Sequence, residues 1–480
     1  MGIGLAQMLG LITFPILTRA LTKDQYGVMS LVTTTILFAV AISKAGLSDG
    51  MIRFYKEYSA SLERRTIFAS TVLMRGLVFS LVSVVLYIAI LPVFSHYLGF
   101  TRNYMICFSV MALYLFIRPL NIIIMNFIRV NDRTFFLNGV NLLLTCFSIG
   151  LSLVLLLYVF RELYGFFIGG VIGEFIAASV FFYWFFKQYS IIPSAASGDL
   201  AKQLIKFGLP LLIGECAFLA LSYADRYLIL AYYNESVLGL YSVGYNLAMY
   251  IANLIMFSIT YAIVPIYVDL YGTEGREKTE AFLGKCLRYL IIALIPICFG
   301  YLAVCRDLFI TLASDKYADA ASFSPIILVG TIVFALNSVF NAGLYLAKKT
   351  AIMLGIMLLA VVVKIAMNVL LLPAYGVMGA AIATLIPCVM VTLLNAYLSS
   401  KYIRVKIDVK SIIYYGALSI VMLFVLRYID TSIASINLVL KVFVGIMIMS
   451  LGAYYKEKDV VLFFKSHFKR MTSYSHKFSG

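Results

Sequence analysis

Hydrophobic runs of about twenty residues recur along this chain from the first residue almost to the last. A run of that length crosses the hydrocarbon core of a membrane as a helix, which satisfies its own backbone hydrogen bonds. Apolar residues make up 63% of the chain and charged residues 12%, against about 45–50% and 25% in soluble domains. The sequence therefore predicts an all-α polytopic membrane protein and excludes a soluble enzyme.

Fourteen transmembrane helices are predicted from these runs. Apolar sequence starts at Met1 without a basic region or a small-residue cleavage site, so we expect the first helix to be a true span rather than a signal peptide. The predicted spans are 2–18, 28–48, 67–94, 104–127, 134–160, 163–186, 207–230, 237–266, 287–304, 324–347, 351–372, 377–398, 411–427 and 432–455.

The basic residues predict the orientation of these spans. Even-numbered connections and the C-terminal tail hold 26 Lys and Arg residues, whereas odd-numbered connections hold 8. Because short basic loops stay in the cytoplasm, both termini are expected there, including a basic tail at 457–480. The net charge of +16 lies at helix ends rather than on a polar face. This pattern favours membrane lipids, and not nucleic acid, as partners.

Two sequence landmarks recur at nearly one offset and indicate an internal repeat. Gly27 and Gly239 follow the first and seventh spans and lie 212 residues apart, and Tyr-Gly pairs ending at Gly165 and Gly376 lie 211 apart. Six spans per repeat make the two halves parallel in the membrane, a plan that encloses a central cavity in many transporters. We expect a bundle at 1–200, a bundle at 201–400, and two additional helices at 401–456.

Ionisable residues inside the spans are the candidates for chemistry. Arg118 and Lys364 lie deep in the hydrocarbon, where a basic side chain costs about 2.5–3.5 kcal/mol, and could bind an anionic substrate. The alternative for each is an ion pair between helices, with Glu174 or Glu215 as partner. Metal ligands are not expected, because none of the three histidines lies in the apolar interior of a span and the seven cysteines are scattered.

The buried acids could couple transport to an ion. Glu174 and Glu215 are predicted at mid-membrane depth, where protonation becomes exchangeable near neutral pH. Asp225 lies nearer the outer face and is followed by Arg226, so a local ion pair with Arg226 is its expected role. Glu174 and Glu215 remain open between ion coupling and structural pairing.

The segment from Asn368 to Thr384 reads Asn-Val-Leu-Leu-Leu-Pro-Ala-Tyr-Gly-Val-Met-Gly-Ala-Ala-Ile-Ala-Thr. It resembles the N-x-x-L-x-P-x-Y-G-x-x-G-A-A-x-A-T signature of bacterial polysaccharide flippases, of the O-antigen and capsule type. These belong to the multidrug/oligosaccharidyl-lipid/polysaccharide exporter superfamily. Stretches at 14–27, 207–212 and 224–241 also fit. Members usually carry a polar or basic stretch before the first span, whereas here Met1 falls inside it.

The resemblance implies a proton- or sodium-driven flippase without a cofactor. It would move undecaprenyl-pyrophosphate-linked oligosaccharides across a bacterial inner membrane for lipopolysaccharide or capsule synthesis, beside a polysaccharide polymerase and a chain-length regulator. The resemblance also implies that Arg19, Arg53 and Arg226 lie at the cavity mouth.

Two other functions compete with this interpretation. A multidrug or cation antiporter of the same superfamily needs an acidic pocket, whereas two buried bases without an excess of acids favour an anionic substrate. A polysaccharide polymerase needs a sizeable outer loop with catalytic residues. Every odd-numbered connection here is short, and the longest runs from Cys305 to Phe323.

Overall fold

The computed structural model describes residues 2–98 and 101–456, except for the side chains of 2–8, 94–98 and 254–262. The predicted tail, 457–480, lies outside the described residues. All regular structure within these ranges is helical. The α-helices are α1 (Gly2–Ala20), α2 (Lys23–Ser43), α3 (Leu47–Tyr58), α4 (Leu62–Leu98), α5 (Arg102–Val130), α6 (Thr134–Val154), α7 (Leu163–Gln188), α8 (Gly198–Tyr223), α9 (Asp225–Tyr232), α10 (Glu235–Thr273), α11 (Arg276–Leu308), α12 (Ser324–Ala335), α13 (Asn337–Phe340), α14 (Ala342–Leu346), α15 (Thr350–Ser399), α16 (Val409–Arg427) and α17 (Ala434–Lys456). Short π or 3₁₀ turns are η1 (Leu155–Val159), η2 (Pro193–Ala195), η3 (Phe309–Ala313) and η4 (Asp315–Ser322).

Eleven helices in the described part of the chain are long and apolar enough to cross a membrane. The chain is thus an all-α polytopic membrane protein. The eleven candidate spans are fewer than the fourteen predicted from the sequence. One physical reason is that α15 runs for 50 residues and contains two predicted spans. In α1 the described apolar part covers only Leu9–Ala20, and part of α10 falls outside the described side chains.

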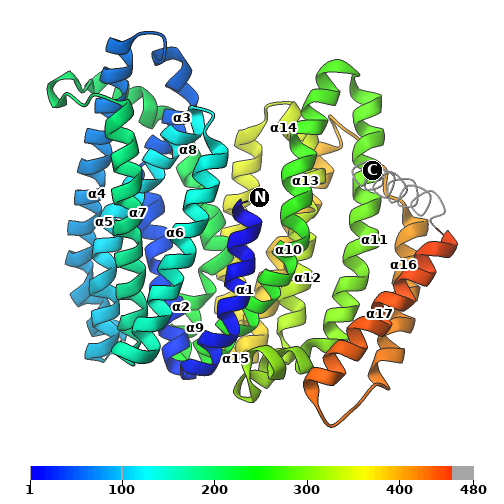
Figure 1. The fold of residues 1–480 in the computed structure, drawn as a ribbon. Helices are drawn as coiled ribbons and strands as arrows, with labels where there is room; N and C mark the ends of the chain where they lie inside the picture. The colour runs from blue at the N-terminus through cyan, green and yellow to red at the C-terminus, as the bar shows by residue number, and fades with distance from the viewer. Residues whose placement is uncertain (1, 99–100, 457–480) are drawn as a thin grey trace, which may run out of the picture.

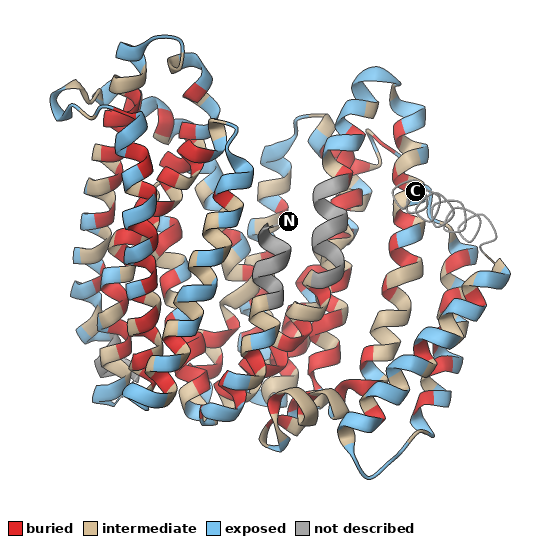
Figure 2. Ribbon diagram, viewed as in Figure 1, coloured by how far each residue is buried: buried red, intermediate tan, exposed pale blue. Residues whose placement is uncertain are grey.

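The helices form two groups, with α1 between them (Figure 1). The helices α4, α5, α6 and α7 make up most of one group, and α10, α11, α12, α16 and α17 lie in the other. The last two helices pack on α11, where Lys441 of α17 pairs with Asp307 at 2.7 Å. Buried residues line the inner faces of both groups and the region where they meet (Figure 2).

The two groups meet where α2 crosses α10, and both helices begin at a repeated landmark. Thr22 caps α2, because its side chain accepts a hydrogen bond from the Gln25 amide at 3.2 Å. Asn234 caps α10 in the same way, through the Val237 amide at 3.0 Å. Gly27 and Gly239 then face one another, and a Cβ on either would overlap the backbone of the opposite helix. The glycines that indicated the repeat therefore lie at a close contact between the two helices.

Two interruptions in the helices shape the second half. The backbone of α15 kinks at Gly376, whose φ of 58° lies in the left-handed region that favours glycine. The Tyr233 hydroxyl donates to the Leu372 carbonyl at 2.8 Å and satisfies a backbone group beside the kink. The second interruption separates α8 from α9 at Ala224 and places Asp225 at the start of α9.

Candidate functional site

A buried ion pair joins Lys364 of α15 to Asp225 of α9. The Lys364 side chain is 1% exposed, and its ammonium donates to Asp225 Oδ2 at 3.0 Å and to the Leu221 carbonyl at 2.6 Å. Leu221 lies in the last turn of α8. Asp225 lies in the first turn of α9, where the helix dipole favours a negative charge. Both acceptors thus lie beside the boundary between α8 and α9 at Ala224.

Other residues complete the surroundings of this pair. Asp225 Oδ2 also accepts from the hydroxyl of Tyr241 in α10 and, at 3.5 Å, from the hydroxyl of Thr384 in α15. Asp225 Oδ1 has no hydrogen-bond partner among the described residues. The prediction that Asp225 pairs with its neighbour Arg226 is wrong, because its carboxylate faces Lys364. In this conformation Lys364 forms the interhelical ion pair considered above, with Asp225 in place of Glu174 or Glu215.

A second ion pair lies in the first half of the chain, between α5 and α7. Arg118 Nη1 donates to both carboxylate oxygens of Glu174 at 3.2 Å, and Asn121 Nδ2 donates to Glu174 Oε1 at 2.6 Å. The Glu174 side chain is 9% exposed and that of Arg118 is 33% exposed. Both line a cavity of about 290 Å³ between α2, α5, α6 and α7. In this conformation Arg118 thus forms the interhelical ion pair considered as its alternative role, with Glu174 as partner and beside a cavity.

Glu215 of α8 pairs with Lys44, which caps the C-terminus of α2, at 2.7 Å. The Glu215 side chain is 38% exposed, whereas that of Lys44 is 11% exposed. Glu215 is therefore less enclosed than Glu174 or Asp225. The pair ties the start of the second half to the first.

Arg226 lies at the junction of the two halves and is 4% exposed. Its guanidinium donates to Thr34 Oγ1 of α2 at 2.7 Å and to Asn246 Oδ1 of α10 at 3.1 Å. It also lies over the rings of Tyr223 and Tyr245, at 4.5 Å and 5.4 Å from their centres. Within the described part of the chain, its hydrogen-bond partners are all neutral. Arg226 therefore keeps a net positive charge at the junction.

Arg19 and Arg53, the other two arginines expected at the cavity mouth, have separate contacts. Arg19, at the end of α1, donates to the Thr311 carbonyl of η3 at 2.8 Å, so it bridges α1 to the second half. Arg53, on α3, is exposed and lies 3.4 Å from Glu57 one helical turn later. The structure therefore does not bring Arg19, Arg53 and Arg226 into one cluster.

Several residues that contact these charged side chains were not predicted from the sequence. Tyr241 lies in the repeated landmark that follows the seventh span, which was the only signal for it. Lys44 was counted with a basic connection, and Asn121 and Asn246 are single amides inside long apolar helices. An amide at such a depth is itself a signal, because buried polar groups need partners.

A comparison with protein families matches residues 16–322 to the family described as "Polysaccharide biosynthesis protein". This match covers more than half of the chain. The chain belongs to the polysaccharide biosynthesis protein family. The recognition of this family from the signature at 368–384 is confirmed. The relative and the solved structures that the chain resembles are named as flippases and transporters rather than as enzymes.

Among solved structures, the fold of this family member is similar to that of the lipid II flippase MurJ in an inward closed conformation. The TM-score is 0.76 at 14% identity, over 96% of this chain and 98% of that one. An inward-facing multidrug resistance MATE family transporter of the MOP superfamily gives a TM-score of 0.62 at 14% identity, over 84% of this chain and 95% of that one. These similarities establish the fold.

Two curated archaeal proteins are similar in sequence. The probable low-salt glycan biosynthesis flippase Agl15 of Haloferax volcanii is 22% identical over 226 residues, which is 47% of each chain. The membrane protein MJ1068 of Methanocaldococcus jannaschii is 23% identical over 279 residues, or 55% of this chain and 54% of that one. The matched region thus spans about half the length of these relatives.

Proposed function

We propose that this protein is a flippase for lipid-linked glycans. Its substrate would be an undecaprenyl-pyrophosphate-linked oligosaccharide repeat unit, moved from the cytoplasmic to the outer leaflet for cell-surface polysaccharide synthesis. Membership of the polysaccharide biosynthesis family supports this proposal, as do the similarity to Agl15 and the fold shared with MurJ.

The observation that carries this proposal is the charge of Arg226 at the junction of the halves. A buried guanidinium with neutral partners is available to an anion once the halves separate, because no carboxylate must first be displaced. A pyrophosphate crossing the membrane needs such a cation, since each unshielded charge costs several kcal/mol. A carrier for cationic drugs would instead be opposed by Arg226. We assign Arg226 to pyrophosphate binding, with Arg19 and Arg53 guiding entry and exit.

Ion coupling is assigned to the paired carboxylates. Glu174, Glu215 and Asp225 each pair with a base, so protonation of the acid would release Arg118, Lys44 or Lys364 for the substrate anion. A proton gradient would then drive the cycle, and sodium is the alternative ion. Lys364 and Arg118 would bind substrate only in the states in which their acids are neutral.

The proposed location is the bacterial cytoplasmic membrane. The basic connections between α3 and α4 and between α10 and α11 lie at one end of the molecule, the upper end in Figure 1. We assign that end to the cytoplasm, with both termini on the same side. The bundles at 1–200 and 201–400 would rock about the contact between α2 and α10. A polysaccharide polymerase and a chain-length regulator would act next.

The test is a deletion in the native host, followed by extraction of lipid-linked oligosaccharide and treatment of spheroplasts with an impermeant sugar-modifying enzyme. Complete single repeats should accumulate on the inner leaflet, and the wild-type gene should restore export. Arg226→Gln should fail to restore it, whereas Lys278→Gln, at an exposed site on α11, should succeed. Single repeats stranded outside would instead indicate a polymerase, and an unchanged glycan would point to drug export.

A further inference from the structure

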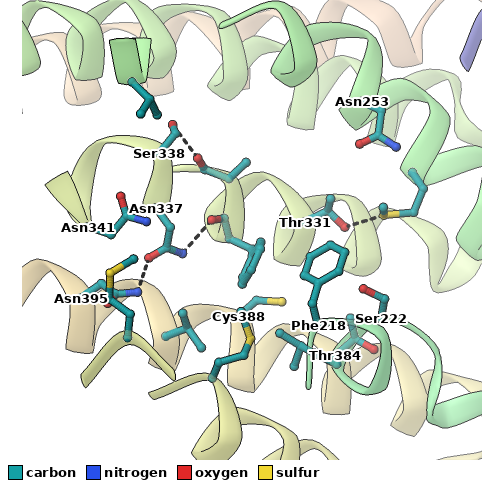
Figure 3. A pocket seen from close by; sticks show the side chains of 18 of the residues that line it. Phe218, Ser222, Asn253, Thr331, Asn337, Ser338, Asn341, Thr384, Cys388 and Asn395 are labelled. Carbon is teal, nitrogen blue, oxygen red and sulfur yellow. Dashed lines mark hydrogen bonds between the residues drawn. The ribbon is translucent and has the colours of Figure 1, made fainter. Parts of the chain in front are cut away.

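A cavity of about 560 Å³ lies within the second half, between α8, α10, α12–α14 and α15 (Figure 3). We call it the C-terminal cavity. Its volume falls in the range of about 300–1,000 Å³ that is usual for ligand sites. In the part of α15 after the kink at Gly376, its lining runs from Thr384 to Asn395, a distance of about 16 Å in a helix. The C-terminal cavity can therefore hold an elongated ligand.

Four amide side chains stand among the polar residues that line this cavity, namely Asn253, Asn337, Asn341 and Asn395. Asn395 Nδ2 donates to Asn337 Oδ1 at 2.8 Å, and Asn337 Nδ2 donates to Thr392 Oγ1 at 3.0 Å. Asn395 is only 5% exposed, yet its Oδ1 has no partner in the described part of the chain. Asn253 and Asn341 line the same cavity and make no side-chain hydrogen bond within the described part of the chain, so their amides are available to a polar ligand.

The rest of the lining restricts the chemistry of that ligand. None of the described residues that line the C-terminal cavity is charged, so a phosphate or an ammonium group would lose its hydration without a counter-ion. Amides both donate and accept, which matches hydroxyl groups. Aromatic rings, among them Phe218 and Tyr267, offer flat apolar surfaces beside the amides. Sugar rings combine hydroxyl groups with apolar faces, whereas an apolar drug would leave the amides unpaired.

The floor of the C-terminal cavity touches the residues that hold the buried ion pair. Thr384 and Leu221 line it, and they contact Asp225 and Lys364 respectively. The cavity therefore ends beside the charges that we assign to coupling, but it does not contain them.

We propose that the C-terminal cavity binds uncharged sugar residues of the glycan, while the pyrophosphate remains between the two halves. This inference rests on the proposed function and divides the substrate between two sites. The four asparagines and Thr331 contact hydroxyl groups, and an aromatic ring packs against a sugar face. Recognition of the sugar is thereby separated from recognition of the charged carrier.

The experiment measures equilibrium binding to the full chain in lipid nanodiscs, with two probes. One probe is lipid-linked glycan extracted from the native host, and the other is undecaprenyl pyrophosphate without sugar. Asn341→Leu and Thr331→Val remove polar groups of the C-terminal cavity, and the second keeps the side-chain shape. Each should weaken glycan-lipid binding about tenfold and leave the sugar-free lipid unaffected. The matched control Asn103→Leu, at an exposed site on α5, should change neither.

The outcomes separate the two proposals. Wild-type affinity of both cavity variants for the glycan lipid would overturn the sugar assignment and leave the proposed function standing. Equal losses for both probes, in variants with a wild-type melting temperature, would also overturn it. A wild-type protein that binds neither probe would overturn the proposed function itself.

Discussion

Replacing Lys364 by Met tests the buried ion pair most directly. Both side chains of the pair are 1% exposed, so Lys364→Met leaves the Asp225 carboxylate buried beside a thioether. Breaking a buried pair from one side costs about 3–5 kcal/mol, because the remaining charge is uncompensated. Asp225→Asn leaves a buried ammonium and should cost a similar amount.

The double variant should recover most of that loss. With both charges gone, no uncompensated charge remains, and replacing a whole buried pair is often close to neutral. We therefore expect a coupling energy of about 3 kcal/mol or more from the double-mutant cycle. The control is the exposed pair of Glu274, which caps the C-terminus of α10, and Lys278 in α11, with an expected coupling below about 1 kcal/mol.

The assay is the free energy of unfolding in mixed detergent micelles, followed by far-ultraviolet circular dichroism. Single losses that add within about 0.5 kcal/mol in the double variant would refute the reasoning, since additivity means that the two sites do not interact. A control coupling as large as that of the buried pair would refute the role of burial.

Three further predictions concern the contacts between and within the halves. Gly239→Ala places a Cβ against the Lys23 carbonyl and should destabilise the protein by about 1–3 kcal/mol. The control Gly272→Ala places its Cβ in open space and should not destabilise the protein. Equal melting temperatures of the two variants would contradict the close contact. Arg226→Lys keeps the charge but loses the planar guanidinium that bridges α2 and α10. The free energy of unfolding should therefore fall by about 2 kcal/mol. An unchanged free energy of unfolding would contradict the bridge. Glu174→Gln retains an acceptor for Asn121 but has no carboxyl proton to exchange. An imposed proton gradient should therefore no longer accelerate flipping in vesicles. Acceleration equal to that of the wild type would remove Glu174 from the coupling residues.

Features that depend on local sequence could be predicted. Apolar runs predicted the helices, because a membrane-spanning backbone must satisfy itself within each segment. The landmarks at Gly27 and Gly239 indicated a repeat, and their close packing gives the physical reason for glycine at both positions. The signature at 368–384 indicated the family by its resemblance, and the structure places its Gly376 at the kink of α15.

Features that depend on tertiary pairing could not be predicted. Lys364 and Asp225 lie 139 residues apart, so no local pattern connects them, and adjacency in sequence favoured Arg226 instead. In the structure α9 turns the side chain of Arg226 toward α2 while Asp225 faces α15. The C-terminal cavity could not be predicted for the same reason, because its asparagines come from three separate segments of the chain.

The central claim is that this protein moves a lipid-linked glycan across a bilayer. The measurement that tests it most directly reconstitutes the purified protein into vesicles that carry glycan lipid in the inner leaflet. An impermeant sugar-modifying enzyme then reports how much glycan reaches the outside. We expect the accessible fraction to rise with wild-type protein and to stay at the level of empty vesicles with Arg226→Gln. Equal accessibility with and without folded wild-type protein would contradict the account.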